Sequence, residues 1–147
     1  MTKFRFSLAR VLELRRAQLE MEQVQLQQKT AARAEADRRQ GDLEAAGTDA
    51  ECEIRRRDLL TGGDLEALGA YRLLVRQQIK EASARRAECE KDLDLQRAAR
   101  MEAHRRVRLL ERLQERRYAE WRAAEDKELD AAAAESYLNA IGRKARC

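Results

Sequence analysis

The stretch LARVLELRRAQLEMEQVQL, residues 8–26, decides the fold class of this chain. Leu12, Leu19 and Leu26 recur at every seventh position, and Leu8 precedes them by one helical turn. A seven-residue leucine repeat without Gly or Pro is typical of a coiled-coil helix, because it places one apolar stripe along one side. The stretch therefore predicts a long helix that packs against a second one.

The same repeat returns in the second half of the chain. Leu68, Val75, Ala82 and Cys89 are again seven residues apart. The stripe continues through Ile79, Leu93, Val107, Leu110, Leu113, Trp121 and Leu129. This pattern predicts a second helix longer than the first.

Composition supports an all-α fold. The 147 residues include 26 Ala and 19 Leu but no Pro, and 39% are charged. Because Ala buries little area, the large apolar side chains suffice for a narrow seam between two helices but not for a compact core. We expect a long two-helix antiparallel coiled-coil hairpin with an overhanging C-terminal helix.

Two segments are expected to interrupt the helices. Residues 61–64, Thr-Gly-Gly-Asp, form the strongest stop, because paired glycines permit positive φ and either Thr61 or Asp64 can cap the following helix. A weaker signal, Gly47 followed by the capping-box pattern of Thr48 and Glu51, predicts a kink or short break. Within one coiled-coil domain, 1–147, the expected parts are a first helix at 1–60 with a possible kink at 41–48, a turn at 61–64, a second helix at 65–141 and a tail at 142–147.

An antiparallel pairing about this turn brings aromatic residues together. Partners in such a pairing have residue numbers that add up to about 125. Phe4 then falls opposite Trp121, and Phe6 opposite Tyr118. Burial of these four rings would clamp the end that carries the N-terminus.

A second apolar stripe runs along nearly the opposite side of the first helix. It consists of Leu14, Ala17, Met21, Val24 and Ala31. It indicates either a broad seam with Ala at its edge or a second face that binds a partner protein.

Catalytic, cofactor and metal sites are not expected. The chain has no Gly-rich phosphate loop, its only His, His104, lies among arginines, and the three cysteines match no ligand spacing. Cys52, Cys89 and Cys147 fit reduced thiols. No run of apolar residues predicts a membrane span or a signal peptide, so we expect a cytoplasmic protein.

The segment at 97–122 carries a local excess of positive charge, with nine Arg and four Glu. It is compatible with a solvated coiled-coil exterior, with the acidic wall of a protein channel, or with nucleic acid. Aromatic residues are not interleaved with the arginines as in single-strand binders, so no nucleic acid is expected as a partner.

Both ends of the chain resemble the flagellar FliJ protein family. KFRFSLARVLELRR, residues 3–16, is similar to the family's basic, aromatic start. LLERLQERRYAEWRAAEDKELDAAAAESY, residues 109–137, resembles its most recognisable segment. The resemblance implies a non-enzymatic stalk of the bacterial flagellar type III export apparatus, cytoplasmic and peripherally associated with the inner membrane. Its implied partners are the export ATPase ring, the cytoplasmic domain of the export gate, and export chaperones.

The resemblance also suggests which residues bind partners. Tyr71 and Leu74 match a family stretch implied to contact the gate. The remaining candidates, expected to face the ATPase ring, are Leu14, Met21, Arg112, Arg116, Arg117, Tyr118 and Trp121. We expect a monomer. An injectisome export stalk, a self-associating structural coiled coil and an Arg-rich nucleic-acid binder remain alternatives.

Overall fold

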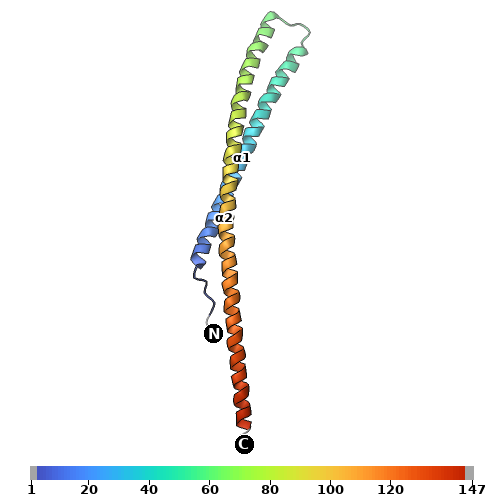
Figure 1. The fold of residues 1–147 in the computed structure, drawn as a ribbon. Coiled ribbons are helices and arrows are strands. Elements are labelled where there is room, and N and C mark those ends of the chain that lie inside the picture. Colours follow the sequence, from blue (N-terminus) through green and yellow to red (C-terminus); the bar gives the residue numbers. More distant parts are fainter. Residues whose placement is uncertain (1–2, 145–147) are drawn as a thin grey trace. The chain divides into compact units, whose positions relative to one another are not determined.

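The structure, a computed structural model, describes residues 3–144 and consists of two helices (Figure 1). Helix α1 spans Ala9–Arg55 and helix α2 spans Gly62–Lys144. The two helices pack against each other, and the described residues contain no strand. The expected all-α class is confirmed.

Helix α1 is shorter than expected at both ends but is not broken. Residues 3–8 precede it without helical structure, and it ends before residues 56–60. It runs through 41–48 without interruption. The hydroxyl of Thr48 donates a hydrogen bond to the backbone oxygen of Glu44, 3.1 Å away, instead of capping a new helix. The short break, one of the two alternatives expected at 41–48, is therefore absent from α1.

Helix α2 begins with a reciprocal cap. The Thr61 amide donates to Asp64 Oδ2 at 3.0 Å, and the Asp64 amide donates to Thr61 Oγ1 at 3.2 Å. These bonds satisfy backbone donors that the first helical turn leaves unpaired. Gly62 and Gly63 are the first helical residues, and neither has a positive φ. The connection therefore lies at 56–61, ahead of the expected turn, and the helix extends past 141 to residue 144.

The chain divides into two compact units, each built from parts of both helices. We call residues 20–102 the central unit, and residues 3–19 with 103–144 the terminal unit. Each unit is described separately below.

In the central unit, α1 and α2 run in opposite directions. As residue numbers rise along α1, those of their partners on α2 fall. Three ion pairs show this order: Arg33 Nε to Glu90 Oε2 at 2.6 Å, Asp37 Oδ1 to Arg86 Nε at 2.9 Å, and Glu51 Oε1 to Arg72 Nε at 2.9 Å.

The core of the central unit is a narrow seam. Buried apolar residues on α2 are Val75, Ala82, Cys89 and Leu93, all members of the predicted stripe. Gln96 is also buried, and its amide donates hydrogen bonds to the backbone oxygen and the carboxylate of Glu22 on α1. A buried polar pair of this kind costs stability unless it is satisfied, and it favours one helix register over others.

Close helix packing explains one glycine of α1. A Cβ atom at Gly47 would lie 3.2 Å from Val75 Cγ1, whereas one at Gly41 would meet nothing within 4 Å. Gly47 therefore admits the Val75 side chain instead of ending the helix.

This difference gives a testable contrast between glycine substitutions. Gly41→Ala and Gly69→Ala should each raise the free energy of unfolding by about 0.5–1 kcal/mol, because Ala favours a helix interior and both sites are open. Gly47→Ala should gain less or lose stability, because Val75 must move. Urea unfolding followed by circular dichroism measures all three. Equal gains at the three sites would contradict the close approach of Gly47 and Val75.

In the terminal unit, Leu12 of α1 and Val107 of α2 are buried, as the two stripes predicted. Arg16 Nη2 lies 3.0 Å from Glu111 Oε1 and joins the helices here. From residue 126 to residue 144, every residue of α2 is exposed.

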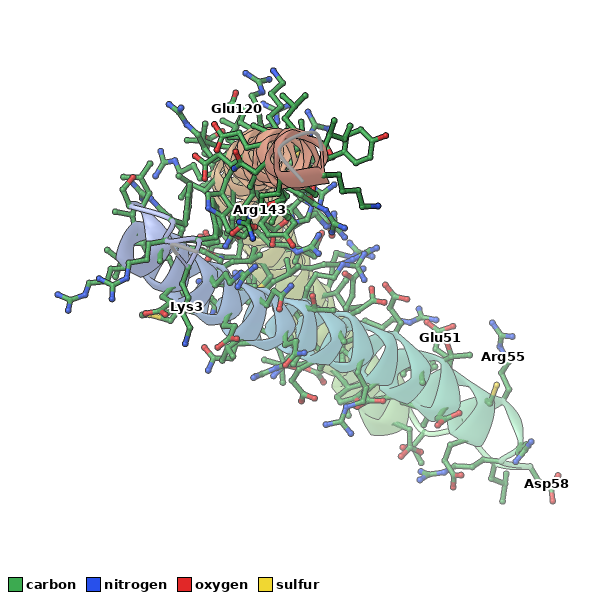
Figure 2. All side chains as sticks on the ribbon, turned by 90° about the horizontal axis from the view of Figure 1, so that it is seen from below. Lys3, Glu51, Arg55, Asp58, Glu120 and Arg143 are labelled. Atoms are coloured by element: carbon green, nitrogen blue, oxygen red, sulfur yellow. The ribbon has the colours of Figure 1, made fainter. Side chains whose placement is uncertain are left out.

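Charged side chains cover the outside of both units. Figure 2 shows them projecting from the helices, including Glu51 and Arg55 in the central unit and Glu120 and Arg143 in the terminal unit. Neither helix, over the described residues, contains a stretch long and apolar enough to cross a membrane.

Candidate partner-binding surfaces

Three aromatic rings form a cluster in the terminal unit. The ring centroid of Phe4 lies 5.3 Å from that of Tyr118, edge to face, and 5.8 Å from that of Trp121. Tyr118 and Trp121 are 5.7 Å apart. The expected pairing of Phe4 with Trp121 is present, but Tyr118 also packs on Phe4 and not on Phe6. Residues 3–8, which we call the N-terminal arm, are thus anchored to α2 through Phe4.

A cavity of about 670 Å³ lies beside this cluster. Its apolar lining comes from Phe4, Phe6, Leu8, Leu113 and Trp121. Its polar lining comes from Lys3, Arg5, Ser7, Arg117 and Glu120. Because Trp121 is half-buried here, it belongs to the fold of the terminal unit, whereas Tyr118 keeps 43% of its surface exposed.

The three candidate arginines of α2 do not share one face. Arg112 and Arg116 are about 40° apart around the helix, whereas Arg117 is about 140° from Arg112. Arg117 lines the aromatic cavity, and its Nη1 lies 3.3 Å from Glu120 Oε2. The structure therefore places Arg117, which is also exposed, on a different face of α2 from Arg112 and Arg116, whereas the sequence analysis grouped all three.

The second stripe of α1 is open to solvent. Leu14 is 58% exposed and Met21 is 62% exposed. Val24, further along the stripe, is exposed as well. The stripe is therefore not part of a broadened α1–α2 seam, and an exposed apolar face on a helix is typical of an interaction surface.

Tyr71 and Leu74 lie on α2 in the central unit, close to its start. Leu74 is 55% exposed, and Tyr71 lines a cavity of about 450 Å³ together with Gly47 and Val75. Leu73 is exposed beside them. These side chains are accessible to a partner, and they lie in a different unit from the candidate arginines.

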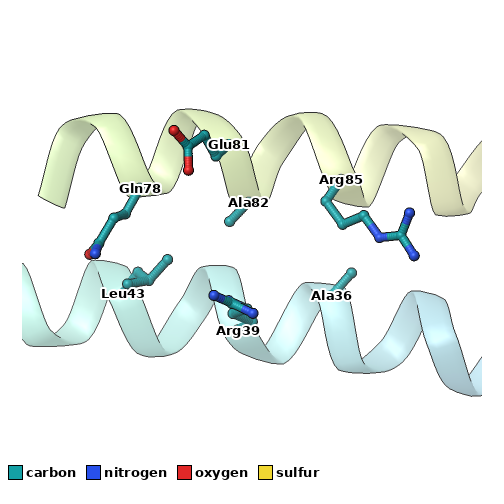
Figure 3. A pocket seen from close by; sticks show the side chains of 7 residues that line it. All are labelled: Ala36, Arg39, Leu43, Gln78, Glu81, Ala82 and Arg85. Carbon is teal, nitrogen blue, oxygen red and sulfur yellow. The ribbon is translucent and has the colours of Figure 1, made fainter. Parts of the chain in front are cut away.

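Sequence reasoning missed a third cavity, of about 310 Å³, in the central unit (Figure 3). Ala36 on α1 and Ala82 on α2 are both buried and small, so they leave space between the helices. Arg39, Leu43, Gln78, Glu81 and Arg85 complete its lining. The signal was present in the sequence, because Ala82 interrupts a stripe of larger residues.

Hydrogen bonds and ion pairs lower the pKa of several carboxyl groups. A hydrogen bond from Arg16 is the main cause that lowers the pKa of Glu111 below its ordinary value of 4.5, and Arg108 adds to it. Hydrogen bonds from Arg33 lower the pKa of Glu90 in the same way. Those from Thr61 lower the pKa of Asp64.

The Glu111 pair predicts a dependence of stability on pH. Because the pKa of Glu111 is lower in the folded chain, its stabilisation is full above pH 4.5 and is lost as the pH falls through the folded value. Glu111→Gln should cost about 1 kcal/mol or less at pH 7, since the pair is partly exposed, and the cost should shrink toward acid pH. Chemical unfolding at a series of pH values measures it. Glu115→Gln is the control. If the free energy of unfolding depends on pH in the same way in both variants, the prediction is contradicted.

The described residues offer no group of three or more His, Cys, Asp or Glu that could hold a metal ion. Cys52 is a half-buried free thiol and Cys89 a buried one, and Cys147 lies outside the described residues. The second stripe of α1 and Arg112 and Arg116 of α2 are exposed to solvent. A comparison of the chain with protein family models, curated proteins and solved structures finds no match.

Proposed function

We propose that this chain is a non-enzymatic component of the bacterial flagellar type III protein export apparatus. It acts as a coiled-coil stalk of the export ATPase ring, links the ring to the export gate, and escorts export chaperones. The proposal includes a cytoplasmic location at the inner membrane. It derives from the resemblance of residues 3–16 and 109–137 to the flagellar FliJ family.

The proposed form of the stalk is an antiparallel coiled-coil hairpin whose second helix overhangs the first. Two features support it. Ion-pair partners in the central unit run in opposite order along α1 and α2. No residue from 126 to 144 is buried.

The observation that carries the proposal is the exposure, in the terminal unit, of large apolar side chains on both helices and of arginines on α2. Leu14 and Leu109 are more than half exposed, and Arg112 and Arg116 are exposed on α2. A protein that only holds its own two helices together has no need for such side chains outside the seam. A ring with an acidic inner wall that surrounds the stalk would bind these side chains by weak, distributed contacts.

Binding to the purified export ATPase tests the proposal. Arg112→Glu with Arg116→Glu should weaken binding and ATPase stimulation by about tenfold or more at low salt, with less difference at high salt. Helix content should not change, because both positions are exposed. Arg55→Glu with Arg56→Glu, two exposed arginines of the central unit, is the matched control.

The same experiment separates the alternatives. An unaltered double variant would place the ATPase contact elsewhere, and a parent chain that binds no export ATPase of either a flagellum or an injectisome would contradict the function. Binding of nucleic acid by the parent, lost in the double variant, would favour the Arg-rich nucleic-acid binder instead.

A further inference from the structure

The outer face of α2 in the terminal unit carries a second regular pattern, separate from the seam with α1. Its residues recur at alternating steps of four and three, the spacing of a coiled-coil interface. They are Arg105, Leu109, Arg112, Arg116, Ala119, Ala123, Asp126, Asp130, Ala133 and Tyr137. All ten are exposed. We call them the outer stripe.

Charge along the outer stripe changes sign at its middle. Arg112 and Arg116 precede the small residues Ala119 and Ala123, and Asp126 and Asp130 follow in the next turns. Within residues 3–144, no ion pair or hydrogen bond involves these two arginines or these two aspartates. Two like charges one turn apart disfavour a lone helix, so both pairs would gain from an opposite partner.

We infer that the outer stripe binds the same stripe of a second copy of this chain, antiparallel, with the twofold axis between Ala119 and Ala123. In a twofold interface each contact occurs twice, and residue numbers rise on one copy as they fall on the other. Arg116 then faces Asp126, and Arg112 faces Asp130. Ala119 faces Ala123, which lets the two helices approach closely at the axis.

The rest of the face fits the same alignment. Arg105 falls opposite Tyr137, an arrangement suited to a cation–π contact, and Leu109 falls opposite Ala133.

Other alignments lose this complementarity. A parallel pair would place Arg112 opposite Arg112 and Asp126 opposite Asp126, which repel. Sliding an antiparallel pair by one heptad would move Arg112 opposite Ala123 in one direction or Tyr137 in the other. The pattern therefore specifies both the direction and the register of the pair.

This inference does not rest on the proposed function, but it has a consequence for it. The outer stripe includes Arg112 and Arg116, the arginines proposed to face the ATPase ring. Pairing with a second copy and binding to the ring would therefore exclude each other. On this inference the chain forms a salt-sensitive dimer away from the ring, in contrast to the monomer expected from the sequence.

Sedimentation equilibrium of the full chain at low salt tests the pair by a charge swap. The parent should reach twice the chain mass of 17.0 kDa. Two variants, Arg112→Asp with Arg116→Asp, and Asp126→Arg with Asp130→Arg, should each raise the dissociation constant about tenfold or more. An equimolar mixture of the two variants should restore the dimer, because every acidic position of one then faces a basic position of the other.

The matched control is Glu128→Arg with Glu135→Arg, which makes the same change of charge in the same segment but on the opposite side of α2. It should stay dimeric, and circular dichroism should show equal helix content in all variants. A parent that remains at 17.0 kDa at low salt and high concentration would overturn the inference. So would a mixture that stays monomeric. The variant Asp126→Arg with Asp130→Arg keeps Arg112 and Arg116, the arginines proposed to bind the ring. Its binding to the ATPase therefore tests the proposed function separately from the dimer.

Cysteine cross-linking tests the direction. In a chain with Cys52→Ser, Cys89→Ala and Cys147→Ser, a mixture of Ala119→Cys and Ala123→Cys chains should form a mixed disulfide on mild oxidation. Ala119→Cys alone should cross-link poorly. If two Ala119→Cys chains cross-link efficiently to each other, and no disulfide forms between Ala119→Cys and Ala123→Cys chains in the mixture, the pair is parallel and the inference is overturned.

Discussion

Replacing Leu93 with Ala should lower the free energy of unfolding by about 2–5 kcal/mol. Leu93 is 3% exposed and lies in the narrow seam of the central unit. Removing its side chain loses buried apolar area and leaves a cavity, and two long helices can close that cavity only partly. The seam contains few other large buried side chains to compensate, because the buried residues Ala82 and Cys89 of α2 are small.

Leu95→Ala is the matched control, because the same residue type two positions further along α2 is 71% exposed. It should change stability by no more than about 0.5 kcal/mol. Urea unfolding followed by circular dichroism measures both variants. Equal losses at the two positions would mean that α1 and α2 do not meet along the predicted stripe.

The contrast between Leu93 and Leu95 illustrates what the sequence could predict. Large apolar residues at heptad spacing identify a buried face, since only a helix with a partner on one side needs that pattern. Leu12, Val75 and Val107 were predicted on this basis, and all three are buried.

Polar residues in the same seam were not predictable from apolar spacing. Glu22 and Arg33 occupy inward positions of α1 and are half-buried, and Gln96 is buried on α2. Each of these side chains forms a hydrogen bond to the other helix. Whether such a polar residue is tolerated in the seam therefore depends on a partner more than fifty positions away in the sequence. A local pattern shows only an interruption at such positions.

Packing between the helices and capping hydrogen bonds determine where the helices end more than local composition does. Gly47 and Thr48 looked like a helix end, but Val75 packs over Gly47, and α1 continues. At Thr61 the local signal was sufficient, because both partners of the cap lie within four residues. For the candidate surface, residue type predicted exposed arginines, but only helix geometry separated Arg117 from Arg112 and Arg116.

The aromatic cluster should hold the N-terminal arm in place. Phe4→Ala with Trp121→Ala should lower stability by more than a surface substitution does, because aromatic pairs add about 0.5–1.5 kcal/mol beyond the area they bury. The cycle of the two single variants and the double variant should show a coupling energy in that range. Thermal and urea unfolding supply the values.

Trp121 is the only Trp of the chain, so its fluorescence reports on the cluster directly. In Phe4→Ala the emission should shift to the red, because water reaches the indole ring where the Phe4 ring packed at 5.8 Å. Hydrogen exchange should also quicken over residues 4–20, since the arm loses its anchor ahead of α1. Tyr71→Ala, in the central unit, is the control and should leave the Trp121 emission unchanged. If Phe4→Ala changes neither the Trp121 emission nor the hydrogen exchange of residues 4–20, the Phe4 ring does not shield the indole ring from water. Residues 3–8 would then be held in place by other contacts.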